Sequence, residues 1–315
     1  MNNKSPVVAI IDVGSNTIKL LIARKRNPLD VIEDKTCQTR IIQRAGNTHR
    51  QLAGESIEAA SESISELVQR AKKHNPHHIT IVATSAVRDA ENQGYLKKRV
   101  LESTGYRLQV LSGEEEALLI SQGVLQDPAL ANICSFYLLD LGGGSLELID
   151  YFNGSINQLV SIPAGAIRIA DNFLENRSSN LNESVAEKIK HFIYEEIKTS
   201  GFTLIKKEQP LVVTSGSLAV AKNLILKQKP KFNNQPSIIP VKMLRTLYTE
   251  ISSLNITQRL KLPGIPASYA DILPIALLTI LFIAEEIDTN QIFHTNFNLR
   301  YGLATKLFSE IIEDS

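Results

Sequence analysis

The chain has 315 residues, of which 43% are hydrophobic and 21% are charged, and its 34 Lys+Arg against 33 Asp+Glu leave a net charge of +1. This composition suits a globular protein of two ordinary domains, and the charge balance excludes a global attraction to nucleic acid or to a membrane surface. The apolar run at the start of the sequence is broken at Asp12, so no signal peptide is expected there. The longest apolar run, Ile272 to Ala284, is shorter than the roughly 18 residues that a membrane-spanning helix needs and predicts a buried core helix. We therefore expect a cytoplasmic protein.

The two cysteines, Cys37 and Cys134, have no metal-ligand spacing. A reduced chain is therefore favoured over a disulfide scaffold. Both lie in segments of β-type composition, which predicts buried, inert thiols.

The first segment, VVAIIDVGSNTIKLLIAR, is an apolar run, a Gly-containing turn and a second apolar run. This pattern predicts a β-hairpin with a tight connection. Residues 57–73 carry apolar side chains at helical spacing, and IVATSAVR after them predicts a strand that runs into a loop and another helix.

The opening pattern then occurs a second time, in FYLLDLGGGSLELIDY. The repetition indicates an internally duplicated chain of two α/β domains, with the two Gly turns lining a cleft between them. We place the boundary near residues 125–131, which gives a first domain of 1–126 and a second of 127–299. Further along, the sequence predicts a helix at 185–198, a strand at 210–214, a solvated loop at 227–235 and helices up to the end.

The two Gly turns are candidate phosphate sites, because each offers successive backbone N–H groups with hydroxyl and amide donors beside them. The alternative is that each is only a hairpin turn, since Asn and Gly supply the backbone conformation that such turns need. Two copies, each following a strand that ends in Asp, favour phosphate binding. The candidate residues are Gly14, Ser15, Asn16 and Thr17 in the first turn, and Gly142, Gly143, Gly144 and Ser145 in the second.

Carboxylates at the mouth of a phosphate site would repel the substrate unless they held a cation. Asp12 and Asp140 therefore suggest Mg²⁺ or another divalent cation that retains several waters. Glu147, on the strand that leaves the second turn, is a third candidate ligand, with an exposed strand position as the alternative.

The segment LSGEEEALL opens a helix, and three acids in a first turn complement the helix dipole. Ser112 and Glu115 fit a capping box, which would make Glu115 structural. Glu116 faces a different direction, because successive helical residues differ by about 100°, and it could orient or deprotonate an attacking water.

Arg88, after a strand and a Thr-Ser pair, could clamp a phosphate and stabilise charge in the transition state. Ser215 and Gly216 belong to a third small turn that opens a helix, where an anion contact and simple N-capping are both open. Positive field for a polyanion could come from Lys19, Arg40, Arg44 and Arg300, although each alone is an ordinary surface residue.

Together these segments resemble the Ppx/GppA phosphatases, within the larger group of actin, sugar kinases and heat-shock chaperone ATPases. The resemblance rests on IIDVGSNTIKLLI, ATSAVRDAEN, LSGEEEALL and LLDLGGGSLEL, with weaker matches in SIPAGAIRIADNFL, VVTSGSLAVAKN and NLRYGLATKL. It implies two actin-like (ribonuclease H-like) α/β domains with an interdomain cleft, the first domain being completed by a C-terminal helix at 300–315.

By the same resemblance, Glu116 takes the place of the water-activating glutamate, Arg88 that of the phosphate-binding arginine, and Asp140 and Glu147 those of the metal-associated acids. Thr17 replaces a common serine and keeps the hydroxyl. The departures, at Tyr269, Ile275 and Asn298, affect the contacts expected for the distal part of the substrate.

The expected activity is hydrolysis of terminal phosphoanhydride bonds of inorganic polyphosphate, with guanosine pentaphosphate as the alternative substrate. Two other classes stay open: a kinase or ATPase of the same fold, and a polyphosphate or alarmone binding protein without turnover. We expect neither nucleic acid nor membrane as a partner, while a homodimer through the apolar C-terminal helices is compatible with the sequence.

Overall fold

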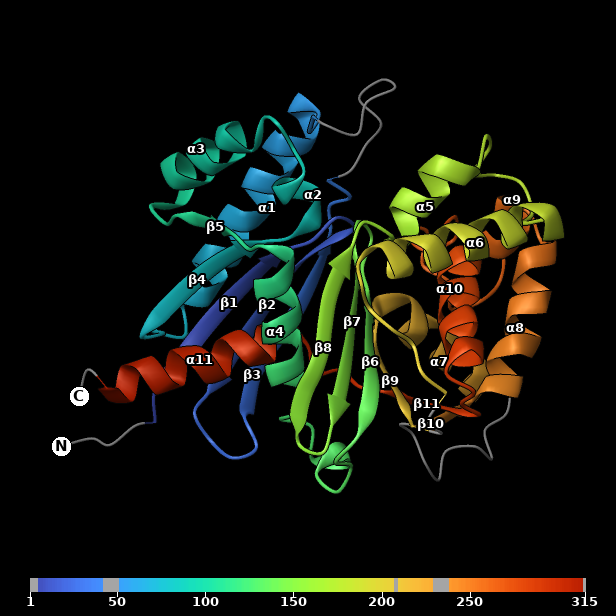
Figure 1. Ribbon diagram of the computed structural model, residues 1–315. Coiled ribbons are helices and arrows are strands. Elements are labelled where there is room, and N and C mark those ends of the chain that lie inside the picture. The colour runs from blue at the N-terminus through green and yellow to red at the C-terminus, as the bar shows by residue number, and fades with distance from the viewer. Residues whose placement is uncertain (1–4, 42–50, 207–208, 229–237, 314–315) are drawn as a thin grey trace. The chain divides into compact units, whose positions relative to one another are not determined.

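The computed structural model describes residues 5–41, 51–206, 209–228 and 238–313. Arg44 and residues 229–235 of the predicted loop lie outside the described residues. By its internal contacts the chain divides into two compact units: unit 1 is Met1–Leu130 with Phe297–Ser315, and unit 2 is Ala131–Asn296. Figure 1 shows the elements of both units.

Unit 1 is built on a five-stranded sheet of order β3-β2-β1-β4-β5 (Figure 1). The first three strands form an antiparallel meander, and β4 and β5 run parallel to β1. The predicted opening hairpin is confirmed, with Val13 paired to Ile18 beside the turn. The strands are β1 (Val7–Val13), β2 (Thr17–Arg24), β3 (Asp30–Gln38), β4 (His78–Ala83) and β5 (Leu108–Val110).

Helices cover both faces of this sheet. Ala9, Ile11 and Val13 on β1 belong to one core cluster with Ile57, Ile64 and other residues of α1, whereas α11 packs against β1 and alongside α4 (Figure 1). Alternate residues of a strand face opposite sides, so Asp12 lies on the face opposite that core. The helices are α1 (Gly54–Lys72), α2 (Ser85–Arg88), α3 (Gln93–Thr104), α4 (Gly113–Val124), the 3-10 turn η1 (Pro128–Leu130) and α11 (Leu299–Glu313).

Two glycines allow α4 and α11 to approach backbone to backbone. A Cβ atom on Gly302 would lie 1.9 Å from the carbonyl oxygen of Leu119, and one on Gly123 would lie 2.1 Å from the carbonyl oxygen of Asn298. These separations are far below any non-bonded contact, so neither position accepts a side chain unless a helix moves. The helix that carries Glu116 is therefore positioned by α11.

Gly302→Ala should destabilise the protein by about 1–3 kcal/mol, because the extra methyl group overpacks a closed interface. Gly94→Ala in α3 is the matched control, since nothing lies within 4 Å of a Cβ built there. The control should be neutral or gain up to about 1 kcal/mol from the higher helix propensity of Ala. Denaturant unfolding measures both changes, and a Gly302→Ala protein as stable as the control would contradict this account of the α4–α11 contact.

Unit 2 repeats the plan on a six-stranded sheet of order β10-β11-β9-β6-β7-β8. The second hairpin and β8 form an antiparallel meander, β9 runs parallel to β6, β11 runs parallel to β9, and β10 is antiparallel to β11. The predicted duplication is therefore confirmed in the sheet topology. The strands are β6 (Phe136–Leu141), β7 (Leu146–Phe152), β8 (Ser155–Ile162), β9 (Leu211–Thr214), β10 (Ile238–Pro240) and β11 (Gln291–His294).

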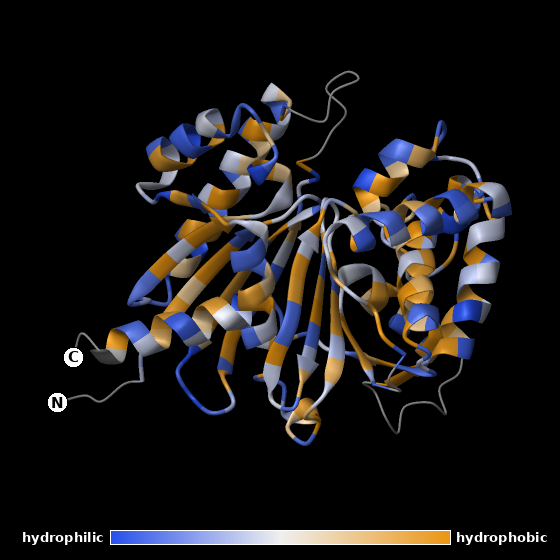
Figure 2. Cartoon of the chain, viewed as in Figure 1, coloured by the Kyte–Doolittle hydropathy of each residue, from blue (hydrophilic) through white to orange (hydrophobic). Residues whose placement is uncertain are grey.

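Helix α10 is the core of the helical layer of unit 2. Every residue from Leu273 to Ala284 is buried, and Figure 2 shows this helix as hydrophobic along nearly all its length. The predicted buried core helix is thus confirmed. It packs against α5 (Ala166–Phe173), α6 (Glu183–Thr199), α7 (Gly216–Gln228) and α8 (Val241–Ser253), and α9 (Ile256–Leu260) completes the unit.

Three local predictions need correction or comment. Cys134 is exposed and Cys37 is only partly buried on β3, so the expectation of buried thiols was wrong. Cys37 lies on an edge strand, which covers its side chains less than a central strand does, and Cys134 precedes β6 rather than lying in a strand. The loop predicted from residue 227 begins later, since α7 extends to Gln228. Within the described segments, no helix combines the length and hydropathy needed to cross a membrane.

Candidate active site

The first Gly turn connects β1 to β2. The Gly14 N–H donates to the Thr17 carbonyl at 3.1 Å, while the carbonyls of Ser15 and Asn16 accept the N–H groups of Ile41 and Arg40 at 3.0 and 3.1 Å. Because these carbonyls are held by the chain, the N–H groups between them are directed toward the opposite side of the loop. Thr17, Ser15 and Asn16 are buried.

The second turn, between β6 and β7, is built in the same way. The Gly142 N–H donates to the Ser145 carbonyl, again at 3.1 Å, and the carbonyls of Gly142 and Gly143 accept N–H groups from the first turn of α5. The guanidinium of Arg168 donates from Nε to the Gly144 carbonyl at 2.8 Å.

A Cβ atom on Gly165, directly before α5, would lie 2.4 Å from the backbone of Gly143 and Gly144, so only glycine permits this close support. Helix α5 therefore holds the second turn from its carbonyl side. The backbone N–H groups of both turns remain suited to phosphate oxygens.

Arg88 and Glu116 meet in unit 1. Arg88 Nη1 lies 2.7 Å from Glu116 Oε2 and 3.1 Å from the Leu111 carbonyl oxygen. Glu116 is buried at 6% exposure, although it belongs to the first turn of α4. The two candidate catalytic residues, which are 28 positions apart in sequence, are thus brought together.

Glu115 has the structural task that its spacing predicted. The Ser112 hydroxyl accepts from the Glu115 N–H, and the Glu115 carboxylate accepts from the Ser112 N–H at 2.8 Å, which completes a capping box. The hydrogen bond from the Ser112 backbone N–H, followed by the interaction with the Ser112 side chain, holds the pKa of Glu115 below its ordinary value. Glu115 and Glu116 therefore have separate roles.

Asp140 and Glu147 are direct cross-strand partners on β6 and β7. The same register places Thr214 of β9 beside Asp140 and Ser161 of β8 beside Glu147, so four polar residues form one row across four strands. Glu147 is only 1% exposed, so the alternative of an exposed strand position for it was wrong. Two like charges directly opposite each other destabilise a sheet unless another group or an ion offsets them.

In unit 1, the position that corresponds to Glu147 carries the opposite charge, because Lys19 occupies it. Asp12 pairs across the strands with Lys19. Burial raises the pKa of Asp12, while the positive charges of Lys19 and Arg300 act to lower it. In unit 1 the protein itself therefore supplies positive charge to the aspartate.

Arg300 is not the surface residue that its sequence context indicated. It is 4% exposed, and its Nη1 atom donates to Asp34 at 2.7 Å and to the Leu20 carbonyl at 3.2 Å. This guanidinium ties α11 to β2 and β3. It contributes to the field at Asp12 from a fixed position.

The third small turn follows β9. Ser215 donates from its hydroxyl to the Leu141 carbonyl at 3.1 Å, which links it to the strand end just before the second turn. A Cβ on Gly216 would lie 2.3 Å from the hydroxyl oxygen of Tyr269, so the tyrosine occupies the space beside the start of α7. Arg259, itself only 1% exposed, donates to the Ala270 carbonyl at 3.0 Å and fixes the loop that carries Tyr269.

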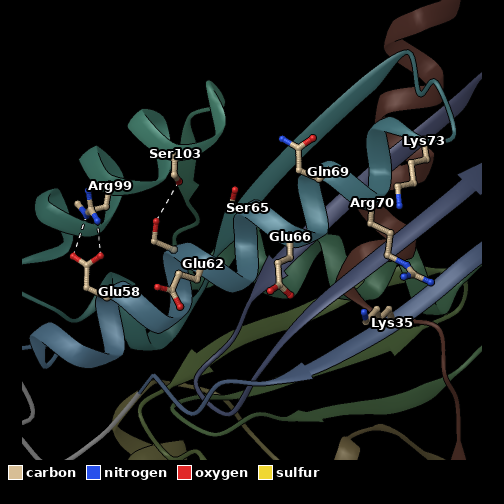
Figure 3. Close-up of a pocket in the computed structure, with 11 residues that line it drawn as sticks. Lys35, Glu58, Glu62, Ser65, Glu66, Gln69, Arg70, Lys73, Arg99 and Ser103 are labelled. Carbon is tan, nitrogen blue, oxygen red and sulfur yellow. Dashed lines mark hydrogen bonds and ion pairs between the residues drawn. The ribbon is translucent and has the colours of Figure 1, made fainter.

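A groove of about 610 Å³ lies elsewhere on unit 1, along α1, α3 and β3 (Figure 3). Two arginines of the lining form ion pairs: Arg99 pairs with Glu58, which also lines the groove, and Arg70 pairs with Glu33, which does not. None of the predicted site residues lines this groove. The lining residues are Lys35, Glu58, Ser61, Glu62, Ser65, Glu66, Gln69, Arg70, Lys73, Arg99 and Ser103.

The donor set fits one kind of metal site. Within the described part of the chain, no group of three or more His, Cys, Asp or Glu converges as a metal cage. Mg²⁺ does not need such a cage, because it binds through one or two carboxylates and completes its shell with waters and substrate phosphates. The pair of Asp140, which is partly buried, and Glu147, which is buried, suits that mode.

Comparison with known proteins agrees with these features. The sequence matches the Ppx/GppA phosphatase family over residues 21–310. The chain belongs to this family. The predicted resemblance is thereby confirmed, as is the α/β fold of two actin-like units.

Individual relatives of this Ppx/GppA protein are distant in sequence. A protein of Vibrio vulnificus named guanosine-5'-triphosphate,3'-diphosphate pyrophosphatase is 26% identical over 316 residues, which cover 98% of this chain and 61% of that protein. The crystal structure of an exopolyphosphatase from Cytophaga hutchinsonii is similar with a TM-score of 0.85 at 21% identity, over 96% of this chain and 98% of the other. The Ppx/GppA enzyme of Aquifex aeolicus gives a TM-score of 0.78 at 20% identity, over 96% and 99% of the two chains. At these identities the solved structures support the fold.

Within this Ppx/GppA protein, the predicted groups have defined local settings. Arg88 contacts Glu116, and Asp140 faces Glu147. Sequence reasoning missed Ser161 and Arg168, which contact Glu147 and Gly144. Both stand in the segment SIPAGAIRIADNFL, whose weak family match was the available signal.

Proposed function

We propose that this protein hydrolyses the terminal phosphoanhydride bond of inorganic polyphosphate and releases orthophosphate. The observation that carries the proposal is the contact of Arg88 with Glu116, in which Arg88 Nη1 lies 2.7 Å from Glu116 Oε2. Glu116 is the candidate general base, and Arg88 is the candidate phosphate-binding residue. The two turns, with their carbonyls held by the chain, supply donors for phosphate oxygens. Family membership supports the reaction class.

In the proposed reaction, backbone N–H groups of the Gly turns bind phosphate oxygens of the substrate, and the guanidinium of Arg88 binds the terminal phosphoryl group. Arg88 uses Nη1 for Glu116, and a guanidinium carries five N–H donors in a planar fork, so one side chain can serve the carboxylate and the phosphate together. Glu116 orients a water and accepts its proton while the water oxygen attacks phosphorus. The bridging P–O bond breaks, and the shortened chain leaves with its negative charge.

Asp140 and Glu147 are the proposed holders of a divalent cation, Mg²⁺ in the first instance. When bound there, the cation would neutralise charge that develops on the transferred group. We do not extend the metal role to Asp12, because Lys19 and Arg300 already supply positive charge beside it. Asp12 instead balances those cations next to the first turn.

Polyphosphate is the favoured substrate because of what its recognition requires. A linear polyanion needs hydrogen-bond donors for its phosphate oxygens and positive charge near them, but it needs no pocket that recognises a nucleobase. Guanosine pentaphosphate is the second candidate, favoured by the name of the Vibrio vulnificus relative. A homodimer through α10 is not part of the proposal, since the apolar residues of that helix are buried within unit 2.

The test is release of orthophosphate with Mg²⁺ from long-chain polyphosphate and from guanosine pentaphosphate, assayed side by side. Faster turnover of polyphosphate, measured as kcat/KM, is the expected result. Faster release from guanosine pentaphosphate would reverse the substrate assignment. Tight binding of either compound without release would identify a binding protein, and a melting shift with ATP or ADP but no release would favour a kinase or ATPase.

A further inference from the structure

Ser161 lies beside the proposed cation ligands but belongs to neither Gly turn. Its hydroxyl donates to Glu147 Oε1 at 2.7 Å, and the two residues are direct cross-strand partners on β8 and β7. Glu147 is 1% exposed and faces Asp140 on its other side. The serine and the aspartate therefore flank the glutamate in one row across the sheet.

The hydrogen bond has two physical effects on Glu147. It is charge-assisted, so it is stronger than a hydrogen bond between neutral groups and holds the carboxylate in place. It also fixes the plane of the carboxylate, because Oε1 is tied to a hydroxyl on a neighbouring strand. Partners of this kind orient metal ligands, and removing one typically lowers metal affinity about 10-fold to 100-fold.

We propose that Ser161 is a positioning residue of the divalent-cation site, acting through Glu147. The inference rests on the proposed function, since the role of Glu147 as a ligand is itself part of that proposal. Ser161 does not contact substrate in this account. Its hydroxyl sets the direction of the glutamate, which binds the cation with Asp140.

The experiment measures Mn²⁺ binding directly, by the electron paramagnetic resonance signal of free Mn²⁺ titrated with protein in the absence of substrate. Mn²⁺ is a suitable probe because it shares the preference of Mg²⁺ for carboxylate and water oxygens. The variants are Ser161→Ala, which removes the hydroxyl, and Ser161→Thr, which keeps it. Ser155→Ala is the matched control on the same strand, because that hydroxyl donates to the Phe152 carbonyl at the far hairpin.

Ser161→Ala should weaken Mn²⁺ binding about 10-fold, and it should raise by a similar factor the Mg²⁺ concentration that gives half-maximal phosphate release. Ser161→Thr should restore both quantities to within about twofold, and Ser155→Ala should leave both at the wild-type value. A merely structural role of Ser161 would lower thermal stability without moving the Mn²⁺ titration, and that result would overturn the proposal. Equal loss in the Thr variant would overturn it as well, because the hydroxyl would then not be the active group.

Glu147→Gln separates this inference from the proposed function. Wild-type Mn²⁺ binding by Glu147→Gln would remove the glutamate from the cation site, and both proposals on that site would fall. Weak binding by Glu147→Gln together with wild-type binding by Ser161→Ala would overturn the role of Ser161 alone. Thermal unfolding of each variant without metal verifies that it is folded.

Discussion

Glu116→Gln should lower kcat for phosphate release by about 10²–10³-fold, the range expected when a general base is lost. Substrate binding should persist or tighten, because glutamine is nearly the same size and loses the negative charge that now holds Arg88 Nη1 at 2.7 Å. The guanidinium is then more available to phosphate. Steady-state kinetics give kcat, and equilibrium binding of polyphosphate gives the affinity.

Glu115→Gln is the neighbouring control for this prediction. A capping box accepts glutamine at the position of Glu115, so the helix should remain intact and turnover should stay near the wild-type value. Comparable losses in the two variants would mean that the acidic first turn of α4 acts as a unit and that Glu116 has no special role. A Glu116→Gln enzyme with wild-type kcat would remove the proposed base.

Arg88→Ala should abolish measurable turnover and also destabilise the fold by about 3 kcal/mol, because it takes the facing guanidinium away from a buried carboxylate. Adding Glu116→Gln to it should recover most of the stability and none of the activity. The exposed fractions of the two side chains, 22% for Arg88 and 8% for Glu116, place the pair below the surface, where such coupling is strong. Denaturant unfolding of the two single variants and the double variant gives the coupling free energy as a double-mutant cycle.

Arg99→Ala provides the comparison with an exposed pair. Arg99 also bonds a glutamate, Glu58, but both side chains are more than a third exposed. Its loss should leave the stability close to the wild-type value, because exposed ion pairs contribute little, and it should leave turnover unchanged. If Arg88→Ala lowered the stability as little as Arg99→Ala, the buried carboxylate of Glu116 would not depend on its ion pair with Arg88.

The two hairpins were predictable because each combines two apolar runs with a Gly turn, and their pairing follows directly from the short connection. The direction of Glu116 was also predictable, since the capping box fixes the start of α4 and helical geometry then turns the next residue away from Glu115. Its burial and its contact with Arg88 agree with that direction. The catalytic roles themselves stay predictions.

The row that contains Ser161 shows where sequence reasoning stops. Asn153 and Gly154, both with positive φ, form a two-residue turn that pairs Phe152 with Ser155. Continuing that register would place Val160 opposite Glu147. A bulge beside Asp150 shifts the register by one residue, and a shift of one residue exchanges the two faces of a strand.

Arg300 and Tyr269 escaped prediction for a different reason. Each meets its partner across a large sequence separation, Asp34 in one case and Gly216 in the other. Nothing in the local pattern around Arg300 distinguishes a buried ion pair from a surface charge. Such contacts depend on tertiary packing alone.

The close contact of α4 with α11 also has a consequence for synthesis on the ribosome. Unit 2 is one continuous stretch, Ala131–Asn296, whereas unit 1 includes α11 from the far side of that stretch. Domains tend to fold as units while the chain emerges from the ribosome. Unit 2 can therefore complete its folding first, although most of unit 1 is synthesised before it, because unit 1 must wait for α11. Until Gly302 reaches Leu119, the helix that carries Glu116 lacks its packing partner, and the nascent chain depends on that late segment to bury it.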